Sequence, residues 1–337
     1  MISRVLVAEQ DADRIAVWRA DPISGQLARE QDYSLAGGPA PMALDPAGGW
    51  IIVGLRAQPG LALVRLDAHG LPLPEPSRID LPQDPCYVSV DRTGRFVLSA
   101  YYAAGCCAVH RISGEGNLEP DAVQWIQAEP HAHCIQTDPA NEYAYLPQTR
   151  PADRIQQFHF DAENGSLAAL STPLATIEPG QGPRHYCYHA ALGCVFVSNE
   201  DGSSVSALVQ DSGTGHLSLR GTWSTLPAGY AGRNTCAQIH LHPGGRWLYV
   251  SNRGHDSLAI FEVDRLNGML RPAGHQETEA TPRAFGIDPT GSYLYAAGLG
   301  SEMLSAYRVD RRSGRLEAIG RYPLGPNPMW VLPVASP

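Results

Sequence analysis

Five arginines, three histidines and one glutamate stand out because they sit beside the same kinds of short hydrophobic segment in different parts of the chain. Guanidinium groups match carboxylate or phosphate oxygens with two parallel hydrogen bonds. The whole chain has 25 Lys and Arg against 34 Asp and Glu, so its net charge of −9 would not attract an anion. If the arginines converge, they therefore predict a local pocket for a small anion. They are Arg56, Arg150, Arg184, Arg253 and Arg283.

The histidines and the glutamate are the groups that could transfer a proton. His133, His185 and Glu200 could each take a proton from water if held within hydrogen-bond reach of it, and the sequence leaves the choice open. His131 and His133 together with Glu200 could instead hold a metal ion. Because the arginines would repel a cation, we expect neither a metal nor a cofactor. The sequence also contains no nucleophile elbow, phosphate loop or CxxC pair.

A repeated turn organises the segments that carry these residues. It reads Asp91-Arg-Thr-Gly-Arg-Phe in one unit and Asp288-Pro-Thr-Gly-Ser-Tyr in another, and each copy leads into a hydrophobic strand. The copies begin, at intervals of 46 to 53 residues, at Asp45, Asp91, Asp138, His189, His242 and Asp288. This period is typical of a propeller or a solenoid. Since each unit offers four short strands, it reads as a propeller blade.

Seven segments could begin an innermost strand, so we predict an all-β, seven-bladed β-propeller with four antiparallel strands per blade and a single domain over residues 1–337. They begin at Gly38, Asp84, Pro130, Gly182, Cys236, Thr281 and Gly325. The last has no strands after it, whereas residues 3–35 supply three strands with none before them. If the C-terminal strand joins the N-terminal blade, the ring closes without an open inner edge. In the alternative, a solenoid, the terminal units would be atypical caps.

The propeller geometry brings the candidate residues to one mouth of the central channel. In an antiparallel blade, the entry to strand one and the loop after strand two lie at the same end. The entries carry Met42, Tyr87, His133, Arg184, Gln238, Arg283 and Met329. The expected substrate contacts are Arg56, Tyr101, Gln148, Arg150, His185, Asn199, Gln238 and Arg253. Alternatively, the arginines pair with acidic neighbours and only line the channel.

Compartment and partners follow from simpler features. The N-terminus has no long apolar run before its first acidic residue, so we expect neither a signal peptide nor a membrane helix. Seven cysteines, an odd number without CxxC spacing, suit free thiols in a reducing compartment. We therefore expect a cytoplasmic protein, a monomer or weak homodimer, that takes a small anionic substrate and binds neither nucleic acid nor membranes.

Several motifs resemble those of the propeller lactonases, and the resemblance extends over nearly the whole chain. The motifs begin at Gly182 (Gly-Pro-Arg-His), Val197 (Val-Ser-Asn-Glu-Asp-Gly), Ile239 (Ile-His-Leu-His-Pro-Gly), Ala280 (Ala-Thr-Pro-Arg-Ala-Phe), Tyr293 (Tyr-Leu-Tyr-Ala-Ala-Gly) and Gly320 (Gly-Arg-Tyr-Pro-Leu-Gly-Pro). The family includes bacterial 6-phosphogluconolactonases and fungal carboxy-muconate cyclases. For the cyclases, one histidine, two arginines and one glutamate are proposed as catalytic residues. By resemblance these correspond to His133, Arg184, Arg283 and Glu200.

The resemblance implies a lactone hydrolase that needs no metal. The first hypothesis is hydrolysis of 6-phospho-D-glucono-1,5-lactone to 6-phospho-D-gluconate in the pentose phosphate pathway. The second keeps the chemistry but takes an unphosphorylated sugar-acid lactone or a carboxylated muconolactone. The third is a non-catalytic propeller that serves as an interaction platform, because a fold does not specify a function. One position departs from the family, since Gln238 stands where relatives usually have an acidic residue.

Overall fold

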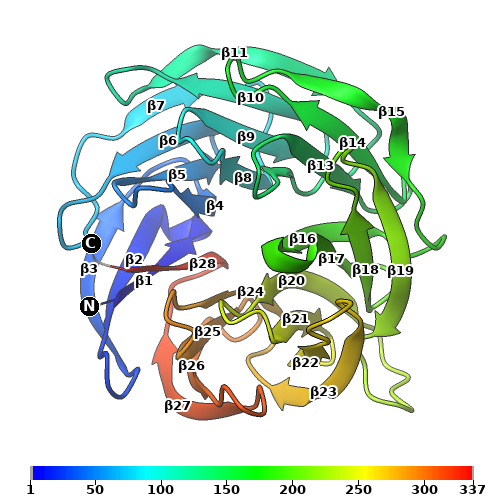
Figure 1. Ribbon diagram of the computed structural model, residues 1–337. Helices are drawn as coiled ribbons and strands as arrows, with labels where there is room; N and C mark the ends of the chain where they lie inside the picture. The colour runs from blue at the N-terminus through cyan, green and yellow to red at the C-terminus, as the bar shows by residue number, and fades with distance from the viewer. Residues whose placement is uncertain (1–2, 336–337) are drawn as a thin grey trace.

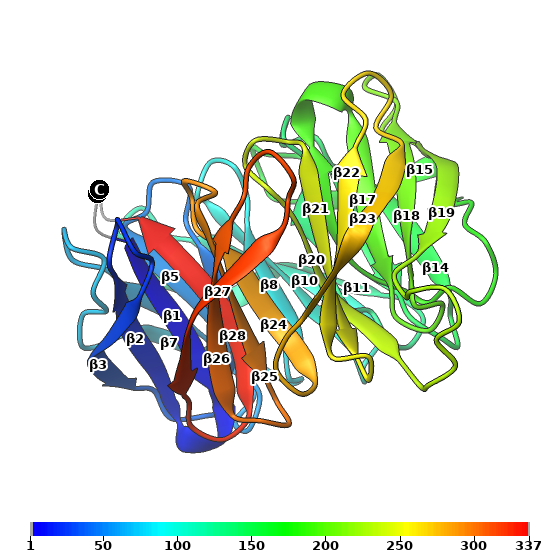
Figure 2. The ribbon, with the colours of Figure 1, turned by 90° about the horizontal axis from the view of Figure 1, so that it is seen from below.

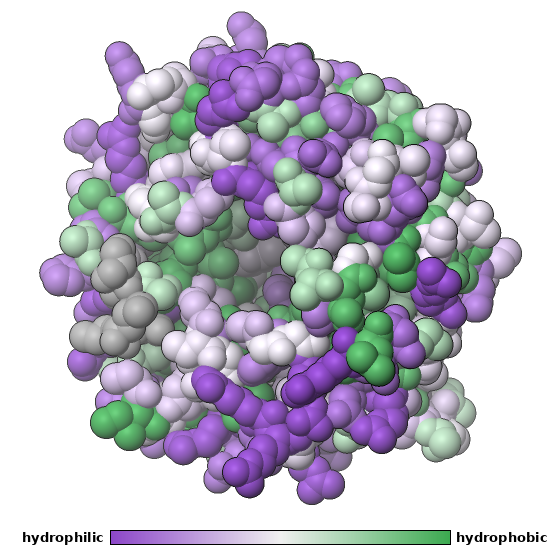
Figure 3. Space-filling model, in the orientation of Figure 1, coloured by the Kyte–Doolittle hydropathy of each residue, from purple (hydrophilic) through white to green (hydrophobic). Residues whose placement is uncertain are grey.

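Short hydrophobic segments separated by glycine-containing turns form seven four-stranded antiparallel sheets in the computed structural model, which describes residues 3–335. The sheets are arranged as blades in a ring (Figure 1). The predicted seven-bladed propeller is therefore confirmed. The face drawn in Figure 3 is hollowed at the centre of the ring and largely hydrophilic around its rim. Over residues 3–335, no helix is long and apolar enough to cross a membrane.

The blades are numbered here from the first complete one, and each is given from its innermost to its outermost strand. Blade 1 has β4 (Pro39–Leu44), β5 (Trp50–Leu55), β6 (Gly60–Arg65) and β7 (Ser77–Asp80). Blade 2 has β8 (Tyr87–Val90), β9 (Phe96–Tyr101), β10 (Cys106–Ile112) and β11 (Leu118–Gln127). Blade 3 has β12 (Gln136–Thr137), β13 (Tyr143–Gln148), β14 (Arg154–Phe160) and β15 (Leu167–Ala175).

The remaining blades follow the same order. Blade 4 has β16 (Pro183–His189), β17 (Cys194–Asn199), β18 (Ser204–Gln210) and β19 (Leu217–Ser224). Blade 5 has β20 (Thr235–Leu241), β21 (Trp247–Arg253), β22 (Ser257–Val263) and β23 (Leu270–Glu277). Blade 6 has β24 (Pro282–Ile287), β25 (Tyr293–Gly298), β26 (Met303–Val309) and β27 (Leu316–Pro323). Blade 7 has β28 (Pro328–Ala335), β1 (Ser3–Glu9), β2 (Arg14–Ala20) and β3 (Leu27–Ser34). Two 3-10 turns, η1 (Gln10–Ala12) and η2 (Ala190–Leu192), complete the elements.

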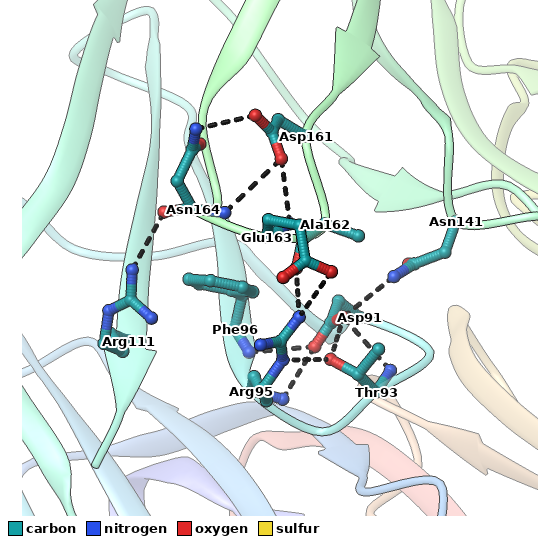
Figure 4. Close-up of polar contacts among 10 residues, drawn as sticks. All are labelled: Asp91, Thr93, Arg95, Phe96, Arg111, Asn141, Asp161, Ala162, Glu163 and Asn164. Carbon is teal, nitrogen blue, oxygen red and sulfur yellow. Dashed lines mark hydrogen bonds and ion pairs between the residues drawn. The ribbon is translucent and has the colours of Figure 1, made fainter.

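Aspartate side chains brace the repeated turns and join neighbouring blades. The Asp91 carboxylate accepts hydrogen bonds from the backbone N–H groups of Arg95 and Phe96, both at 2.8 Å, which ties the turn to the start of β9. Its second oxygen accepts a 2.9 Å bond from Asn141 Nδ2 of the next blade (Figure 4). Arg111 Nη2 in blade 2 also donates a 3.1 Å hydrogen bond to Asn164 O in blade 3. The sequence repeat therefore encodes both a turn and a contact between blades.

The ring closes through its two ends, as predicted. Strand β28 pairs antiparallel with β1, with Leu332 opposite Leu6, and completes blade 7 (Figure 2). The buried Glu9 carboxylate supports this junction, because it accepts a 2.8 Å hydrogen bond from the backbone N–H of Gly325 and an ion-pair contact from Arg14. The strand pairing and this carboxylate together connect the last segment of the chain to the first.

Glu9→Gln should therefore weaken the junction. The amide keeps most of the shape but loses the charged hydrogen bonds, so we expect the free energy of unfolding to fall by about 1–3 kcal/mol. Urea titration followed by circular dichroism measures this change. Glu163→Gln is the matched control, since its exposed carboxylate lies 3.7 Å from Arg95 and should contribute less than about 0.5 kcal/mol. Equal stability of both variants would contradict this role for Glu9.

One predicted strand is wrong in extent. The innermost strand of blade 3 was expected to start near Pro130, but β12 contains only Gln136 and Thr137. The chain does pair with β13 at Ala132, which faces Gln148 in an isolated bridge, but regular pairing resumes only at Gln136. Residues 133–135, between these two points, form an irregular segment.

Candidate active site

β-bulges at the start of innermost strands direct single side chains toward the channel. In β16, Pro183 and His185 pair with the adjacent residues Asn199 and Ser198, so Arg184 is the extra residue of a bulge. Bulges of this kind are common beside active sites because they change the direction of a side chain. The equivalent bulge residues elsewhere are Arg283 in β24 and Met329 in β28.

These residues and their neighbours form a pocket at one mouth of the channel. Its lining comes from blades 1, 2, 4, 5, 6 and 7. The lining residues are Ala40, Pro41, Arg56, Cys86, Arg184, His185, Gln238, Arg283, Met329 and Trp330. The free volume inside this lining is about 10 Å³, which is room for one water molecule. A larger ligand would therefore lie outside this space, toward the mouth.

Glu200 lies between two arginines at the mouth. Its Oε2 is 3.3 Å from Arg184 Nε, and its Oε1 accepts a hydrogen bond from Arg253 Nη2. Burial acts to raise the pKa of Glu200, but Arg184 and Arg253 outweigh burial and lower it. Burial lowers the pKa of Arg184 to about 9, which still leaves it charged at neutral pH. The three groups are therefore two cations that share one carboxylate.

The other two arginines of the pocket differ in how they are paired. Arg56 forms an ion pair with Asp84 at 2.8 Å. Arg283 makes no ion pair with any residue from 3 to 335. Burial, followed by the charges of Arg253 and Arg56, lowers the pKa of Arg283 to about 10. A partly buried guanidinium without a carboxylate is well suited to bind an anionic or polarised ligand oxygen.

Three rings from separate blades meet across the channel and form the floor of the pocket. Tyr87 and His185 have ring centroids 5.0 Å apart, Tyr87 and Trp330 5.6 Å, and His185 and Trp330 6.0 Å. Each ring comes one residue after a pocket-lining residue, for example His185 after Arg184, and so lies further along its innermost strand. The rings therefore narrow the channel below the arginines.

His133 belongs to a second row of rings beside this floor. Its ring centroid is 5.0 Å from that of His185 and 5.4 Å from that of Tyr102, which stacks on His131. Burial, followed by Arg184, holds the pKa of His133 and of His185 well below 6.5. Both imidazoles are therefore neutral at pH 7. His133 Nδ1 and His185 Nε2 are buried without a hydrogen-bond partner among the described residues.

Three residues expected at the mouth lie inside the blades instead. Tyr101, Gln148 and Asn199 are the last residues of their strands, and all are almost fully buried. Tyr101 Oη is 2.8 Å from Ser99 Oγ, and Asn199 Nδ2 donates to Ser204 Oγ at 2.8 Å. Because successive strand side chains point to opposite faces, the residue that reaches the mouth comes one position later.

That later position explains which of the expected residues reach the mouth. The residue that comes directly after the last pair between the second and third strands is Arg56 in blade 1, Glu200 in blade 4 and Arg253 in blade 5. In blade 2 the equivalent residue is Tyr102. Arg150 is exposed and lies outside the pocket lining. Gln238 lines the pocket, with its Oε1 bound by Phe285 N at 2.8 Å.

Tyr101→Phe should therefore leave any activity of this site within about twofold of wild type, since it removes only a hydroxyl buried inside blade 2. Tyr102→Leu should lower kcat/KM at least about fivefold, because it removes the ring that packs against His131 and His133. Steady-state kinetics of the two variants shows which of the two tyrosines faces the mouth. A larger loss in Tyr101→Phe than in Tyr102→Leu would contradict the assignment.

The sequence did not identify the aromatic floor. Met329 was expected at the entry to the last strand, yet nothing in the sequence shows that its neighbour Trp330 meets His185 of a distant blade. Over residues 3–335, no three His, Cys, Asp or Glu side chains converge to hold a metal ion.

Comparison with known proteins agrees with this architecture. The family described as "Lactonase, 7-bladed beta-propeller" matches residues 60–333. Curated 6-phosphogluconolactonases of Yersinia pseudotuberculosis and Pectobacterium carotovorum are each 33% identical, over 98% and 97% of both chains. Among solved structures, a periplasmic gluconolactonase of Pseudomonas aeruginosa has a TM-score of 0.89 and 25% identity over all of both chains. A putative 6-phosphogluconolactonase of Bacteroides fragilis has the same TM-score and identity over 99% of this chain and 98% of its own.

Proposed function

We propose that this chain, which belongs to the seven-bladed β-propeller lactonase family, hydrolyses 6-phospho-D-glucono-1,5-lactone to 6-phospho-D-gluconate in the pentose phosphate pathway. The observation that carries the proposal is the pocket in which Arg184 and Arg283 lie beside a neutral buried histidine. Relatives that are 33% identical over nearly the whole chain carry the name of this activity. The pocket combines cations for an oxyanion with a base for water.

The reaction follows from these charges. Arg184 and Arg283 would donate hydrogen bonds to the lactone carbonyl oxygen, which becomes negative when water adds to the carbonyl carbon. A neutral imidazole would accept the proton of that water, and the same proton would return to the ring oxygen as the C–O bond breaks. Glu200 is the weaker candidate for the base, because two arginines bind it and lower its pKa. We assign it to positioning Arg184 and Arg253.

The phosphate would lie toward Arg56 and Arg253 at the mouth. The structure also favours a second candidate substrate, an unphosphorylated sugar lactone, for one reason. Arg56 already has a carboxylate partner in Asp84, so its charge is partly neutralised. The P. aeruginosa structure named a gluconolactonase has the same fold with a TM-score of 0.89.

Arg56→Gln should separate these substrates. We expect kcat/KM for the phosphorylated lactone to fall about 10- to 100-fold, from the loss of one charge-assisted contact, while that for glucono-1,5-lactone changes less than about twofold. Arg150→Gln is the control, because this exposed arginine lies outside the pocket lining. If Arg56→Gln affects both substrates equally, the phosphate does not bind there.

The setting of the enzyme is part of the proposal. All seven cysteines are free thiols, and all of them except Cys187 are buried, which suits a reducing compartment. We place the activity in the cytoplasm, in a monomer or weak homodimer that takes a small anionic lactone.

A further inference from the structure

The small space inside the pocket has the partners that a bound water needs. Its volume of about 10 Å³ suits one molecule, and a buried water normally makes two to four hydrogen bonds. Among the lining residues, Arg184 has Nη1 buried without a hydrogen-bond partner in the described chain, while its Nε faces Glu200, and His185 has Nε2 buried without a partner. Arg283 and Gln238 line the same space. Donors and one potential acceptor therefore surround a site of water size.

His185 is also held more rigidly than a surface histidine. It is 4% exposed, and Tyr87 and Trp330 pack against its ring from blades 2 and 7. His133 is equally buried but is not among the pocket-lining residues. Its ring lies near those of His185 and Tyr102, at centroid distances of 5.0 and 5.4 Å. Of the two histidines, only His185 borders the water-sized space.

We infer that His185, rather than His133, accepts the proton of the hydrolytic water, which occupies the small space between His185 and Arg184. The inference rests on the proposed lactone hydrolysis. Water oxygen bonds to the carbonyl carbon while its proton passes to Nε2, so Nδ1 carries the proton of the resting imidazole. When the C–O bond to the ring oxygen breaks, the imidazolium returns that proton to the leaving alkoxide. One water is consumed, and the product carboxylic acid ionises into solvent.

Two matched variants test the assignment. In His185→Gln, we expect kcat to fall about 10²- to 10³-fold with KM changed less than about threefold. In His133→Gln, which removes a ring behind the first, the loss should be less than about tenfold. Calorimetry of 6-phospho-D-gluconate binding checks that the pocket is intact in each variant, and circular dichroism checks that each variant is folded. Full kcat in His185→Gln, or the larger loss in His133→Gln, would overturn the assignment.

A third variant keeps the test decisive if glutamine disturbs the floor. His185→Gly should regain at least about tenfold in kcat when imidazole is added, while His133→Gly should not. Rescue of His133→Gly alone would assign the base to His133. Inactivity of the wild type toward the lactone would instead reject the proposed function, so the two failures can be told apart.

Discussion

Arg283→Met should produce a protein that is more stable than wild type and nearly inactive. Arg283 has no ion-pair partner among the described residues, and burial, followed by the charges of Arg253 and Arg56, lowers its pKa and makes its charged form costly. Methionine keeps much of the aliphatic stem and removes that charge. We expect the free energy of unfolding to rise by about 1–3 kcal/mol. Loss of one donor to the developing oxyanion should lower kcat about 10²- to 10³-fold.

Urea titration and lactone kinetics on the same preparation measure both effects. Arg312→Met serves as the control, because Arg312 is an exposed residue of an outer turn and should change neither quantity. A variant that is less stable and fully active would show that Arg283 is a structural residue of the channel. That result would favour the alternative in which the arginines only line it.

Deletion of residues 328–337 should abolish both the fold and the activity. Without β28, strand β1 becomes an open inner edge, and its buried residues Val5, Leu6 and Val7 lose their cover. The deletion also removes Met329 and Trp330 from the pocket. We expect insoluble or unfolded protein, detected by the loss of a cooperative urea transition.

A circular permutant separates strand pairing from chain length. Joining the ends by a short linker and opening the chain between the exposed residues Ser212 and Gly213 keeps β28 beside β1. This permutant should fold and keep activity within about threefold of wild type. A truncated protein that unfolds cooperatively and retains activity would show that ring closure is dispensable.

The periodic features of the chain were predictable because each depends on local sequence. The turn built on Asp91 recurs with its glycine and aromatic residue, so the number of blades and the closure by the last strand could be counted. Arg184 and Arg283 were found for the same reason, since each follows a proline at the entry to an innermost strand.

Features set by one-residue offsets or by contacts between distant blades could not be predicted. Tyr101 and Tyr102 are adjacent identical residues, and only the strand pairing of Tyr101 with Cys106 shows which of them faces the mouth. The floor formed by Tyr87, His185 and Trp330 joins three blades that are far apart in the sequence. No local pattern records that these rings meet.

The most direct test of lactone hydrolysis is the rate at which the purified protein opens freshly generated 6-phospho-D-glucono-1,5-lactone, followed through coupled 6-phosphogluconate dehydrogenase. Glu200→Gln and Arg283→Met are measured beside the wild type. We predict an acceleration over spontaneous opening that both variants reduce at least about tenfold while remaining folded. No acceleration by the wild type on this lactone, on glucono-1,5-lactone or on a carboxylated muconolactone would contradict the account and favour a non-catalytic propeller.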